Sequence, residues 1–360
     1  MTMDAIANRF RQRIVAAGAA RTPLRVRGGG SKDWYGQTPE GEVLETSDYR
    51  GIVAYEPTEL VVTARCGTPL RELEEELARQ GQMLAFEPPH FGPGATVGGM
   101  LAAGLSGPRR QAAGAVRDFV LGAVLMDGRG DTLRFGGQVM KNVAGYDVSR
   151  LLAGSLGMLG LVLEVSLKVL PRPTAEATLR LELAQEDALL RLNQWAGQPL
   201  PLSASAWCDG VLTLRLSGAQ AAVAAAVRRI GGETLAPHVA GQWWSDLREH
   251  RHACFDAAGD APLWRLSLPS TAPALPAPEG GMQLIEWGGS QRWLRGAVDP
   301  LALRAQAAEL GGHATLFRGG DKRHGVFQPL APAVQAIHRN LKQYFDPAGV
   351  FNPGRMYREL

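Results

Sequence analysis

The sequence of 360 residues predicts an α+β protein with two domains. Apolar residues make up 45% of the chain and charged residues 20%, which is the balance of a globular protein with substantial cores. Glycine-rich loops interrupt the strands of the first half, whereas strands and helices alternate after Pro171-Arg172-Pro173 as in a unit built on an antiparallel sheet. We therefore expect domains at 1–172 and 173–340, followed by a tail at 341–360.

Local patterns define the elements of the first domain. Thr68 and Pro69 precede a stripe of leucines that Gly81 ends, which predicts a helix capped by Thr68 with Pro69 at its first position. Asp127-Gly128 is a turn signal between two apolar runs and predicts a hairpin. The expected elements are helices at 3–17, 69–80 and 97–105, and strands at 24–26, 52–55, 60–64, 119–126, 132–135 and 161–169.

Residues 151–170 are the nearest approach to a membrane span. They contain Glu164 and Lys168, and from Leu161 onwards the odd positions are apolar while most even ones are polar. A period of two predicts a half-buried strand and not a bilayer helix. Arginines interrupt the alanines at the start of the chain, so there is no signal-peptide core. We expect a soluble, cytoplasmic protein.

The second domain shows strands and helices in alternation, with a Pro/Ala/Gly-rich loop at 272–281. Its expected strands are 175–183, 204–208, 211–216, 233–236, 263–268, 282–287, 291–295 and 313–318. Its expected helices are 185–197, 219–230, 240–256 and 299–310, and a last helix follows at 331–345.

Three glycine-rich stretches of the first half are the main functional signal: Arg27 to Ser31, Gly92 to Pro108 and Gly154 to Gly160. Backbone without Cβ atoms can fold its N–H groups into a concave anion site and let a ligand approach closely. Three such loops in one half-chain indicate a long ligand that contains a diphosphate.

The common phosphate motifs do not fit these loops. The fingerprint G-x-G-x-x-G starts at Gly92 and Gly94 but meets Val97 at its third glycine position, and Ser31-Lys32 has the wrong order for a P-loop. Ordinary NAD and ATP sites are therefore disfavoured. The net charge of +3 comes from scattered residues, which argues against a nucleic-acid partner.

The cysteines predict neither a metal cluster nor a disulfide. Cys66, Cys208 and Cys254 are far apart and form no C-x-x-C, so an iron–sulfur or cysteine-rich zinc site does not fit. An odd, sparse count is typical of a reducing compartment.

Five ordered motifs resemble a known family: V-R-G-G-G-S, A-T-V-G-G, R-D-F-V-L-G, the run G-S-L-G-M-L-G-L-V, and the tail F-D-P-A-G-V-F-N-P-G-R. Together they resemble the FAD-binding fold shared by vanillyl-alcohol oxidase, p-cresol methylhydroxylase (the PCMH/VAO type) and D-lactate dehydrogenase flavoproteins, here with a divergent α+β cap domain. The segment at 141–147 resembles the 2-hydroxyacid branch, and the whole chain is similar to the FAD-binding E subunits of bacterial glycolate oxidase.

The resemblance implies that the three loops bind FAD and that the tail at 352–355 returns to close over the flavin region. Ser31 stands where covalent members carry a histidine, so the FAD is expected to be non-covalent. The implied cofactor-binding residues are Arg27, Gly28, Gly29, Gly30, Ser31, Gly94, Thr96, Val97, Gly98, Gly99, Gly104, Ser106, Gly107, Gly157, Gly160, Val162 and Arg355.

The family's histidine-rich catalytic motif is absent from this sequence. Oxidation of a 2-hydroxyacid needs an arginine for the carboxylate and a base for the hydroxyl proton, and the weak candidates are Arg265, Arg318 and His324. His250 and His252 lie one residue apart in an expected helix, point to different faces, and are interpreted as surface or interface residues and not metal ligands.

The resemblance also implies partners: a second FAD-binding catalytic subunit and an iron–sulfur subunit, with membrane contact only through them. The expected function is FAD-dependent oxidation of glycolate to glyoxylate within such a complex. Two alternatives stay open, namely a self-sufficient FAD oxidoreductase acting on an alcohol or hydroxyacid, and a structural subunit that binds the cofactor without catalysis.

Overall fold

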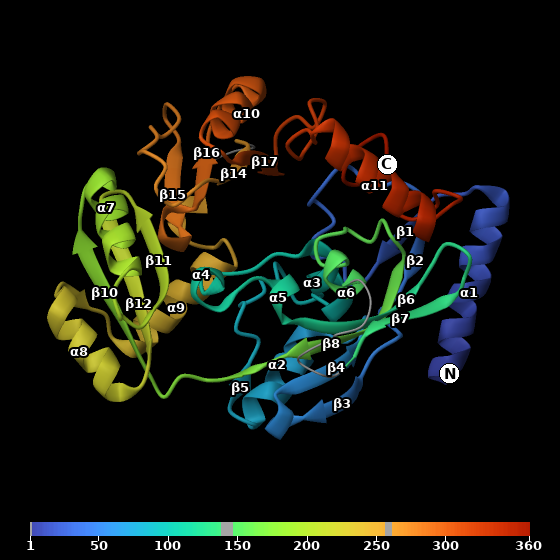
Figure 1. The fold of residues 1–360 in the computed structure, drawn as a ribbon, viewed down its shortest axis with the longest axis horizontal. Coiled ribbons are helices and arrows are strands. Elements are labelled where there is room, and N and C mark those ends of the chain that lie inside the picture. The colour runs from blue at the N-terminus through green and yellow to red at the C-terminus, as the bar shows by residue number, and fades with distance from the viewer. Residues whose placement is uncertain (1, 138–146, 256–260) are drawn as a thin grey trace. The chain divides into compact units, whose positions relative to one another are not determined.

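A computed structural model describes residues 2–137, 147–255 and 261–360. The chain divides into two compact units. The first comprises Met1–Leu105, Ala115–Pro171 and Pro329–Leu360, and the second comprises Ser106–Gly114 and Arg172–Gln328. Two segments therefore differ in placement from the expected domains: residues 106–114 belong to the second unit, and the helix after residue 331 belongs wholly to the first (Figure 1).

The first unit contains a five-stranded antiparallel sheet in the order β3-β4-β8-β6-β7 and two small two-stranded sheets, β1-β2 and β5-β9. Its strands are β1 Leu24–Arg27, β2 Glu42–Glu45, β3 Ile52–Glu56, β4 Val61–Arg65, β5 Gln82–Met83, β6 Val120–Met126, β7 Thr132–Gly136, β8 Leu161–Lys168 and β9 Leu170–Pro171. Its helices are α1 Met3–Ala20, the short η1 Pro57–Glu59, α2 Leu70–Arg79, α3 Val97–Ala103, α5 Val116–Phe119, α6 Val148–Leu151 and α11 Pro332–Phe345.

Strand β8 is buried on both faces, whereas its alternating sequence pattern predicted that one face would be exposed to solvent. The reason is its central place between β4 and β6, where polar side chains find partners on the neighbouring strand. The Ser166 hydroxyl lies 2.8 Å from that of Thr63, and Glu164 lies 4.0 Å from Arg65. Buried polar groups are tolerated when they are hydrogen-bonded, so an alternating sequence can fill a central strand.

Helix α1 covers part of this unit with one apolar stripe. Thr2 caps it by accepting a hydrogen bond from the main-chain N–H of Ala5, and Ile6, Phe10 and Ile14 are buried at helical spacing. These side chains share one core cluster with Phe351 of the C-terminal tail. The tail is therefore built into the first unit.

The expected cap of α2 is wrong. The helix begins at Leu70, with Pro69 before it as the N-cap residue, and Thr68 makes no capping bond to it. The Thr68 hydroxyl instead accepts from the N–H of Gly51 at 2.9 Å and donates to the Gly51 carbonyl at 3.2 Å. A tertiary contact thus uses the side chain that the local sequence assigned to the helix.

The second unit is an eight-stranded antiparallel sheet with the order β13-β10-β12-β11-β15-β16-β14-β17, which confirms the expected α+β architecture. Helices α7 and α8 bury Leu192 and Val223 in one core with the sheet, and α10 contributes Leu303 to a second core. The strands are β10 Ala175–Glu182, β11 Leu202–Cys208, β12 Val211–Gly218, β13 Glu233–Thr234, β14 Leu263–Ser267, β15 Met282–Glu286, β16 Gln291–Arg295 and β17 His313–Arg318. The helices are α4 Arg110–Ala113, α7 Gln185–Ala196, α8 Gln220–Ile230, α9 Pro237–Arg248, η2 Ala253–Phe255, η3 Trp287–Gly289 and α10 Pro300–Glu309.

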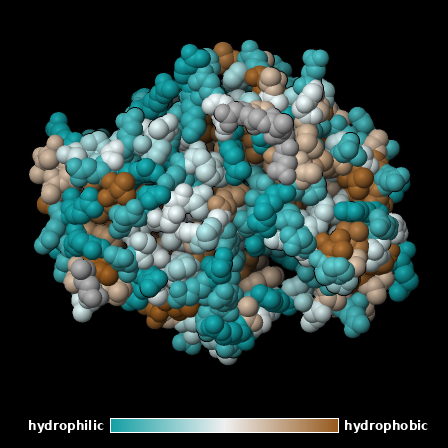
Figure 2. Space-filling view, turned by 180° about the vertical axis from the view of Figure 1, so that it is seen from behind, coloured by the Kyte–Doolittle hydropathy of each residue, from teal (hydrophilic) through white to brown (hydrophobic). Residues whose placement is uncertain are grey.

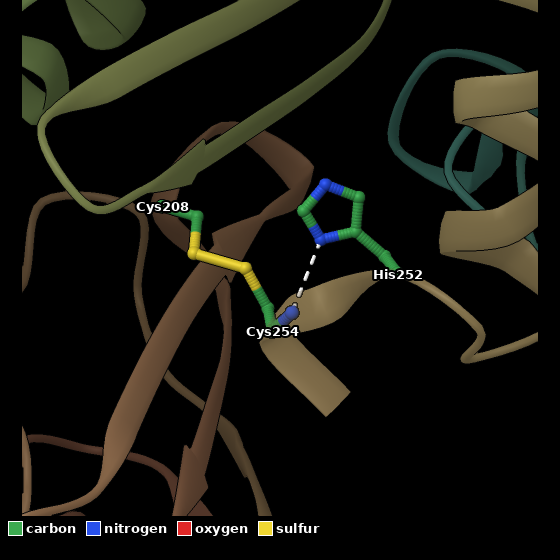
Figure 3. Close-up of a disulfide and its surroundings, with 3 residues drawn as sticks. All are labelled: Cys208, His252 and Cys254. Atoms are coloured by element: carbon green, nitrogen blue, oxygen red, sulfur yellow. Dashed lines mark hydrogen bonds between the residues drawn. A yellow bond between two sulfur atoms is a disulfide. The ribbon is translucent and has the colours of Figure 1, made fainter. Parts of the chain in front are cut away.

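A disulfide joins Cys208 at the end of β11 to Cys254 in η2, so the expectation of no disulfide is wrong (Figure 3). The main-chain N–H of Cys254 also donates to Nδ1 of His252 at 3.3 Å. The two cysteines are 46 residues apart, and only the tertiary fold brings them together. Sequence spacing alone therefore gave no sign of the pair.

His250 also departs from its expected place. Helix α9 ends at Arg248, and His250 follows it in the left-handed region with φ 54°. Its ring stacks on Phe255 with a centroid distance of 3.9 Å and meets Trp293 edge-on at 4.7 Å. His250 is therefore part of an aromatic cluster and not a helix-surface residue.

None of the helices in the described residues is long and apolar enough to cross a membrane. On the face shown in Figure 2, apolar atoms form small separate patches among hydrophilic ones.

Candidate functional site

The first two glycine loops of the first unit touch backbone to backbone. A Cβ atom on Gly29 would lie 1.5 Å from the carbonyl oxygen of Gly94, and one on Gly94 would lie 2.6 Å from the carbonyl oxygen of Gly29. A Cβ on Gly28 would lie 2.4 Å from Oγ1 of Thr96, which caps α3. Only glycine fits such an approach, so the glycines of both loops are required by a single arrangement.

Arg27 opens the first loop and is held by two carboxylates. Its Nε donates to Asp33 at 2.8 Å and its Nη1 donates to Glu45 at 3.2 Å. The hydrogen bond with Asp33 is the main cause that raises the pKa of the Arg27 guanidinium. Because Asp33 also accepts from Arg25, the positive charge here is largely matched within the protein. The loop would therefore meet an anion mainly with its main-chain amides.

The C-terminal tail fixes these loops from the other end of the sequence. Arg355 donates through Nη2 to the Asp33 carbonyl at 2.7 Å and through Nη1 to the Gln37 carbonyl. Burial lowers the pKa of Arg355 to about 10, opposed by Asp33 and assisted by Arg25. Asn352 accepts from the Val26 N–H at 2.8 Å and donates to the Leu156 carbonyl at 2.6 Å. The tail therefore joins the first strand to the third glycine loop.

A cavity of about 90 Å³ lies where the loops and the tail meet, and we call it the loop cavity. Its size suits a diphosphate group and not a whole dinucleotide. Within the described residues, no group accepts a hydrogen bond from the main-chain N–H of Gly29, Gly30 or Ser31. These donors, together with a backbone that no Cβ obstructs, fit the diphosphate of FAD.

Nine of the residues implied by the resemblance line the loop cavity: Arg27, Gly28, Gly29, Gly30, Ser31, Gly94, Thr96, Gly99 and Arg355. The other residues lining it were not among them: Val26, Lys32, Asp33, Tyr35, Ala102, Ala103, Leu156 and Asn352. Of these, Asn352 lies in the tail that was expected to return. Asp33 carried no signal of its own, because it acts through its place beside the first glycine loop. Leu156 lies inside the third glycine stretch, of which only glycines were singled out.

Eight implied residues lie outside the loop cavity: Val97, Gly98, Gly104, Ser106, Gly107, Gly157, Gly160 and Val162. Several of these glycines serve close packing inside the first unit. A Cβ on Gly98 would lie 2.7 Å from that of Cys66, one on Gly104 would lie 2.7 Å from Gly154, and one on Gly160 would lie 2.8 Å from the Met126 carbonyl oxygen. Val97 and Val162 are buried side chains of α3 and β8.

The remaining members of that set are placed by other contacts. A Cβ on Gly157 would meet the amide nitrogen of Asn352 at 2.7 Å. Ser106 and Gly107 belong to the second unit, where the Gly107 carbonyl accepts a hydrogen bond from the Trp287 indole at 3.1 Å. Residues 106–108, the end of the second glycine stretch, therefore belong to the unit that contains the eight-stranded sheet.

The second unit brings Arg265 and Arg318 together on the neighbouring strands β14 and β17. The Arg265 guanidinium lies 5.5 Å from the centre of the Phe317 ring. Burial lowers the pKa of His250 well below its usual value, and the two arginine charges lower it further. Arg265, Arg318 and His250 therefore form a cluster of two cationic side chains and one neutral imidazole.

His324 is not part of this cluster. It lies exposed in the loop after β17, and its carbonyl accepts a hydrogen bond from Nη1 of Arg304 at 2.6 Å. Of the segment at 141–147, only Asp147 is described; it caps α6 by accepting from the Arg150 N–H at 3.4 Å. Residues 141–146 lie outside the described residues. Within the part that is described, no group of three or more His, Cys, Asp or Glu residues could hold a metal ion.

Comparison with known proteins identifies the family of this chain. Residues 8–136 match the family described as FAD binding domain. The chain is also 50% identical to glycolate oxidase subunit GlcE of Escherichia coli (strain K12) over 340 residues, which is 94% of each protein. The chain belongs to the GlcE family of glycolate oxidase subunits. FAD is its cofactor, and the chain is an FAD-dependent oxidoreductase of this family.

Other relatives extend the likeness to 2-hydroxyacid enzymes. A D-lactate dehydrogenase of Archaeoglobus fulgidus is 27% identical over 94% of this chain and 86% of its own length. Glycolate oxidase subunit GlcD of Bacillus subtilis (strain 168) is 32% identical over 44% of this chain and 34% of its own length. Among solved structures, an alkyldihydroxyacetonephosphate synthase superimposes with a TM-score of 0.64 at 16% identity, covering 95% of this chain and 74% of its own, which shows the fold alone.

Proposed function

We propose that this chain is the FAD-binding subunit of a complex that oxidises glycolate to glyoxylate and passes the electrons to partner subunits. The observation that carries the proposal is the contact of Gly29 with Gly94 in a domain that matches an FAD-binding family. The 50% identity to a glycolate oxidase subunit supports the substrate, a small 2-hydroxyacid.

The chain's own residues would bind and orient the cofactor. FAD, when bound, supplies the flavin ring that takes two electrons from the substrate carbon. The amides of Gly29, Gly30 and Ser31 would meet the diphosphate, and Arg355 would hold the loop from behind by its bonds to carbonyl groups. Ser31 offers no nucleophilic imidazole, so the FAD is proposed to be non-covalent. Acid precipitation should leave the yellow colour in the supernatant.

In the second unit, Arg265 and Arg318 are the proposed contacts for the substrate carboxylate. Arginine suits a carboxylate because its planar fork donates two parallel hydrogen bonds. Burial and the charges of both arginines lower the pKa of His250 and keep its imidazole neutral, and we propose this imidazole as the proton acceptor. His324 is a weaker candidate because it lies apart from them.

The partners proposed are a second FAD-binding catalytic subunit and an iron–sulfur subunit, and the complex would reach a membrane only through them. Among the described residues, one cysteine is free and two are paired, so the chain holds no cysteine cluster of its own to receive electrons. The proposed location is the cytoplasm, although a reducing compartment disfavours a bridge such as Cys208–Cys254.

The test adds glycolate or D-lactate to the purified chain under anaerobic conditions and follows the flavin absorbance, with and without the two partner subunits. Reduction that requires the partners supports the proposal. Bleaching by the chain alone would establish the second candidate, a self-sufficient FAD oxidoreductase, which the 27% identity to a D-lactate dehydrogenase favours. Full turnover with a chain that cannot be reduced would establish a purely structural subunit.

A further inference from the structure

The bridged Cys208 lies on the same face of the eight-stranded sheet as the cluster around His250. Cys208 on β11 is in register with Leu284 on β15, which is in register with Trp293 on β16. Trp293 is in turn in register with Arg265 on β14. Residues directly opposite each other in an antiparallel pair point to the same face of the sheet. Cys208 therefore begins a row that runs to Trp293, whose ring meets that of His250.

The short helix η2 lies over this row and contacts it at two consecutive residues. Cys254 forms the bridge to Cys208, and the ring of Phe255 meets that of Trp293 edge-on at 5.6 Å. The Phe255 ring also stacks on the His250 ring, with 4° between the planes and 3.9 Å between the centroids. The residue that covers the imidazole therefore follows directly after the bridged cysteine.

His250 and Phe255 are held by different parts of the second unit. His250 follows the end of α9, and its N–H donates to the Leu247 carbonyl at 3.2 Å. Phe255 is held from the sheet through the bridge beside it. An aromatic stack alone is a weak contact, so it persists only while both of its rings are held in place. The bridge therefore keeps Phe255 over the imidazole, whose Nδ1 is buried.

The other bonds of Phe255 would not replace the bridge. Nη1 of Arg295 donates to the Phe255 carbonyl at 2.6 Å. Because an arginine side chain has many rotamers, it can follow a carbonyl that moves, whereas the covalent bridge fixes the backbone at Cys254. The Phe255 N–H donates to the His252 carbonyl at 2.8 Å, and this bond lies within the segment and would move with it.

The bridge is accessible at its Cys208 end. Cys208 is half-buried and precedes the exposed Asp209, whereas Cys254 is 5% exposed. Thiol–disulfide exchange needs access for the attacking thiolate, and accessible bridges are generally the labile ones. Disulfides of cytosolic proteins are usually transient, either catalytic or redox-sensing. In the proposed location, this bridge would therefore be a reversible one.

We propose that the Cys208–Cys254 bridge is a redox latch: in the bridged state Phe255 covers His250, and reduction releases η2 and opens the imidazole. A dithiol supplies the reducing equivalents. Its first thiolate attacks Sγ of Cys208, forms a mixed disulfide there and expels Cys254 as a thiolate, which takes up a proton. Its second thiolate breaks the mixed disulfide and leaves Cys208 as a thiolate, which is also protonated. The net exchange gives the protein two electrons and two protons, and the cyclic disulfide of the reductant reverses it.

The test uses the full chain with FAD bound and dithiothreitol as the dithiol. Diethyl pyrocarbonate modifies accessible imidazoles, and peptide mass spectrometry follows its rate at His250 and, as an internal control, at the exposed His238 of α9. Cys208→Ala removes the bridge permanently. Cys66→Ala removes only the buried free thiol of the first unit and is the matched control. Iodoacetamide labelling gives the state of the bridge, and circular dichroism checks the fold.

We expect reduction to raise the modification rate of His250 at least tenfold and to leave that of His238 unchanged. Oxidised dithiothreitol should restore the protection, and Cys66→Ala should respond like the wild type. Cys208→Ala should show the fast rate with or without the dithiol, with the circular dichroism of the wild type.

An unchanged rate at His250, once both cysteines are shown to be reduced, overturns the latch. So does a bridge that the dithiol reduces only in the unfolded chain, because access to Cys208 is then absent in the native state. A reduction that unfolds the second unit also overturns it, since the bridge would then be purely structural.

The effect on catalysis rests on the proposed function, because His250 is the base proposed there. If both hold, reduction should also raise the turnover of glycolate by the assembled complex. Opening of His250 in a complex that never turns over would refute the proposed function and leave the latch standing. Turnover that ignores the dithiol while His250 stays covered in the reduced chain would refute the latch alone.

Discussion

A Cβ atom on Gly29 would lie 1.5 Å from the carbonyl oxygen of Gly94, far inside van der Waals contact. We therefore predict that Gly29→Ala separates the two loops and lowers FAD affinity at least tenfold, which corresponds to about 1.4 kcal/mol. The clash is with backbone, so no side-chain rotation can relieve it. The measurement is the flavin-to-protein ratio after gel filtration, followed by titration with added FAD.

Gly241→Ala is the control, because a Cβ there meets nothing within 4 Å. Gly241 lies inside helix α9, where alanine should stabilise the chain by about 0.5–1 kcal/mol. A Gly29→Ala protein that retains a full complement of FAD would show that the loop contact does not shape the cofactor site.

The second prediction concerns Arg355, whose guanidinium donates to the Asp33 and Gln37 carbonyls of the first loop. Arg355→Met removes these bonds and leaves buried carbonyl groups unpaired, at about 1–3 kcal/mol. We expect faster release of FAD and a lower unfolding temperature, both measured by flavin fluorescence. Arg339→Met, on the exposed side of α11, should change neither. Equal behaviour of the two variants would contradict the role given to the tail.

The local sequence pattern was enough to predict most helices and strands, because helices and strands differ in the spacing of their apolar residues. The hairpin of β6 and β7 and the sheet of the second unit follow from turns and apolar spacing that a sequence displays directly. Thr68 shows the limit: its hydroxyl has the position of a cap, but the Gly51 backbone binds it instead. Such competition between local and tertiary partners cannot be read from neighbours in the sequence.

The sequence predicted those parts of the candidate site that consist of glycine backbone. The glycines at 28–30 and 94 stand out in the sequence because they cluster, and the family resemblance implied that they bind the cofactor. Asp33 acts by position alone, so no pattern marked it, whereas Leu156 lies in the marked stretch 154–160 but was not singled out there. The cysteine pair depends on the fold that joins β11 to η2, and 46 intervening residues hide it.

The third prediction counts thiols. The native chain should react with no thiol reagent, because Cys208 and Cys254 are paired and burial raises the pKa of the Cys66 thiol to about 12. In denaturant one thiol should react, and after reduction three. Reduction should also lower the free energy of unfolding by about 2–4 kcal/mol, since the bridge closes a long loop. Three reactive thiols in unreduced, denatured protein would contradict the bridge.

The last prediction is a pH dependence that originates at His250. Burial, assisted by Arg318 and Arg265, holds its folded pKa well below the ordinary value of 6.5. Between the folded pKa and 6.5 the unfolded chain binds a proton that the folded chain does not, so stability is complete above 6.5 and falls as the pH falls. From pH 6.5 to about 5.5 this group alone should cost about 1 kcal/mol.

His250→Asn isolates the contribution, because asparagine tolerates the left-handed backbone at this position and does not titrate. The variant should lose overall stability, since the aromatic stack disappears, but its free energy of unfolding should fall less steeply between pH 6.5 and about 5.5. His238→Asn, exposed on α9, is the control and should keep the wild-type slope. Chemical denaturation at a series of pH values measures both. An unchanged slope in His250→Asn would mean that the His250 imidazole stays accessible to protons, and it would then no longer qualify as the neutral base proposed for the second unit.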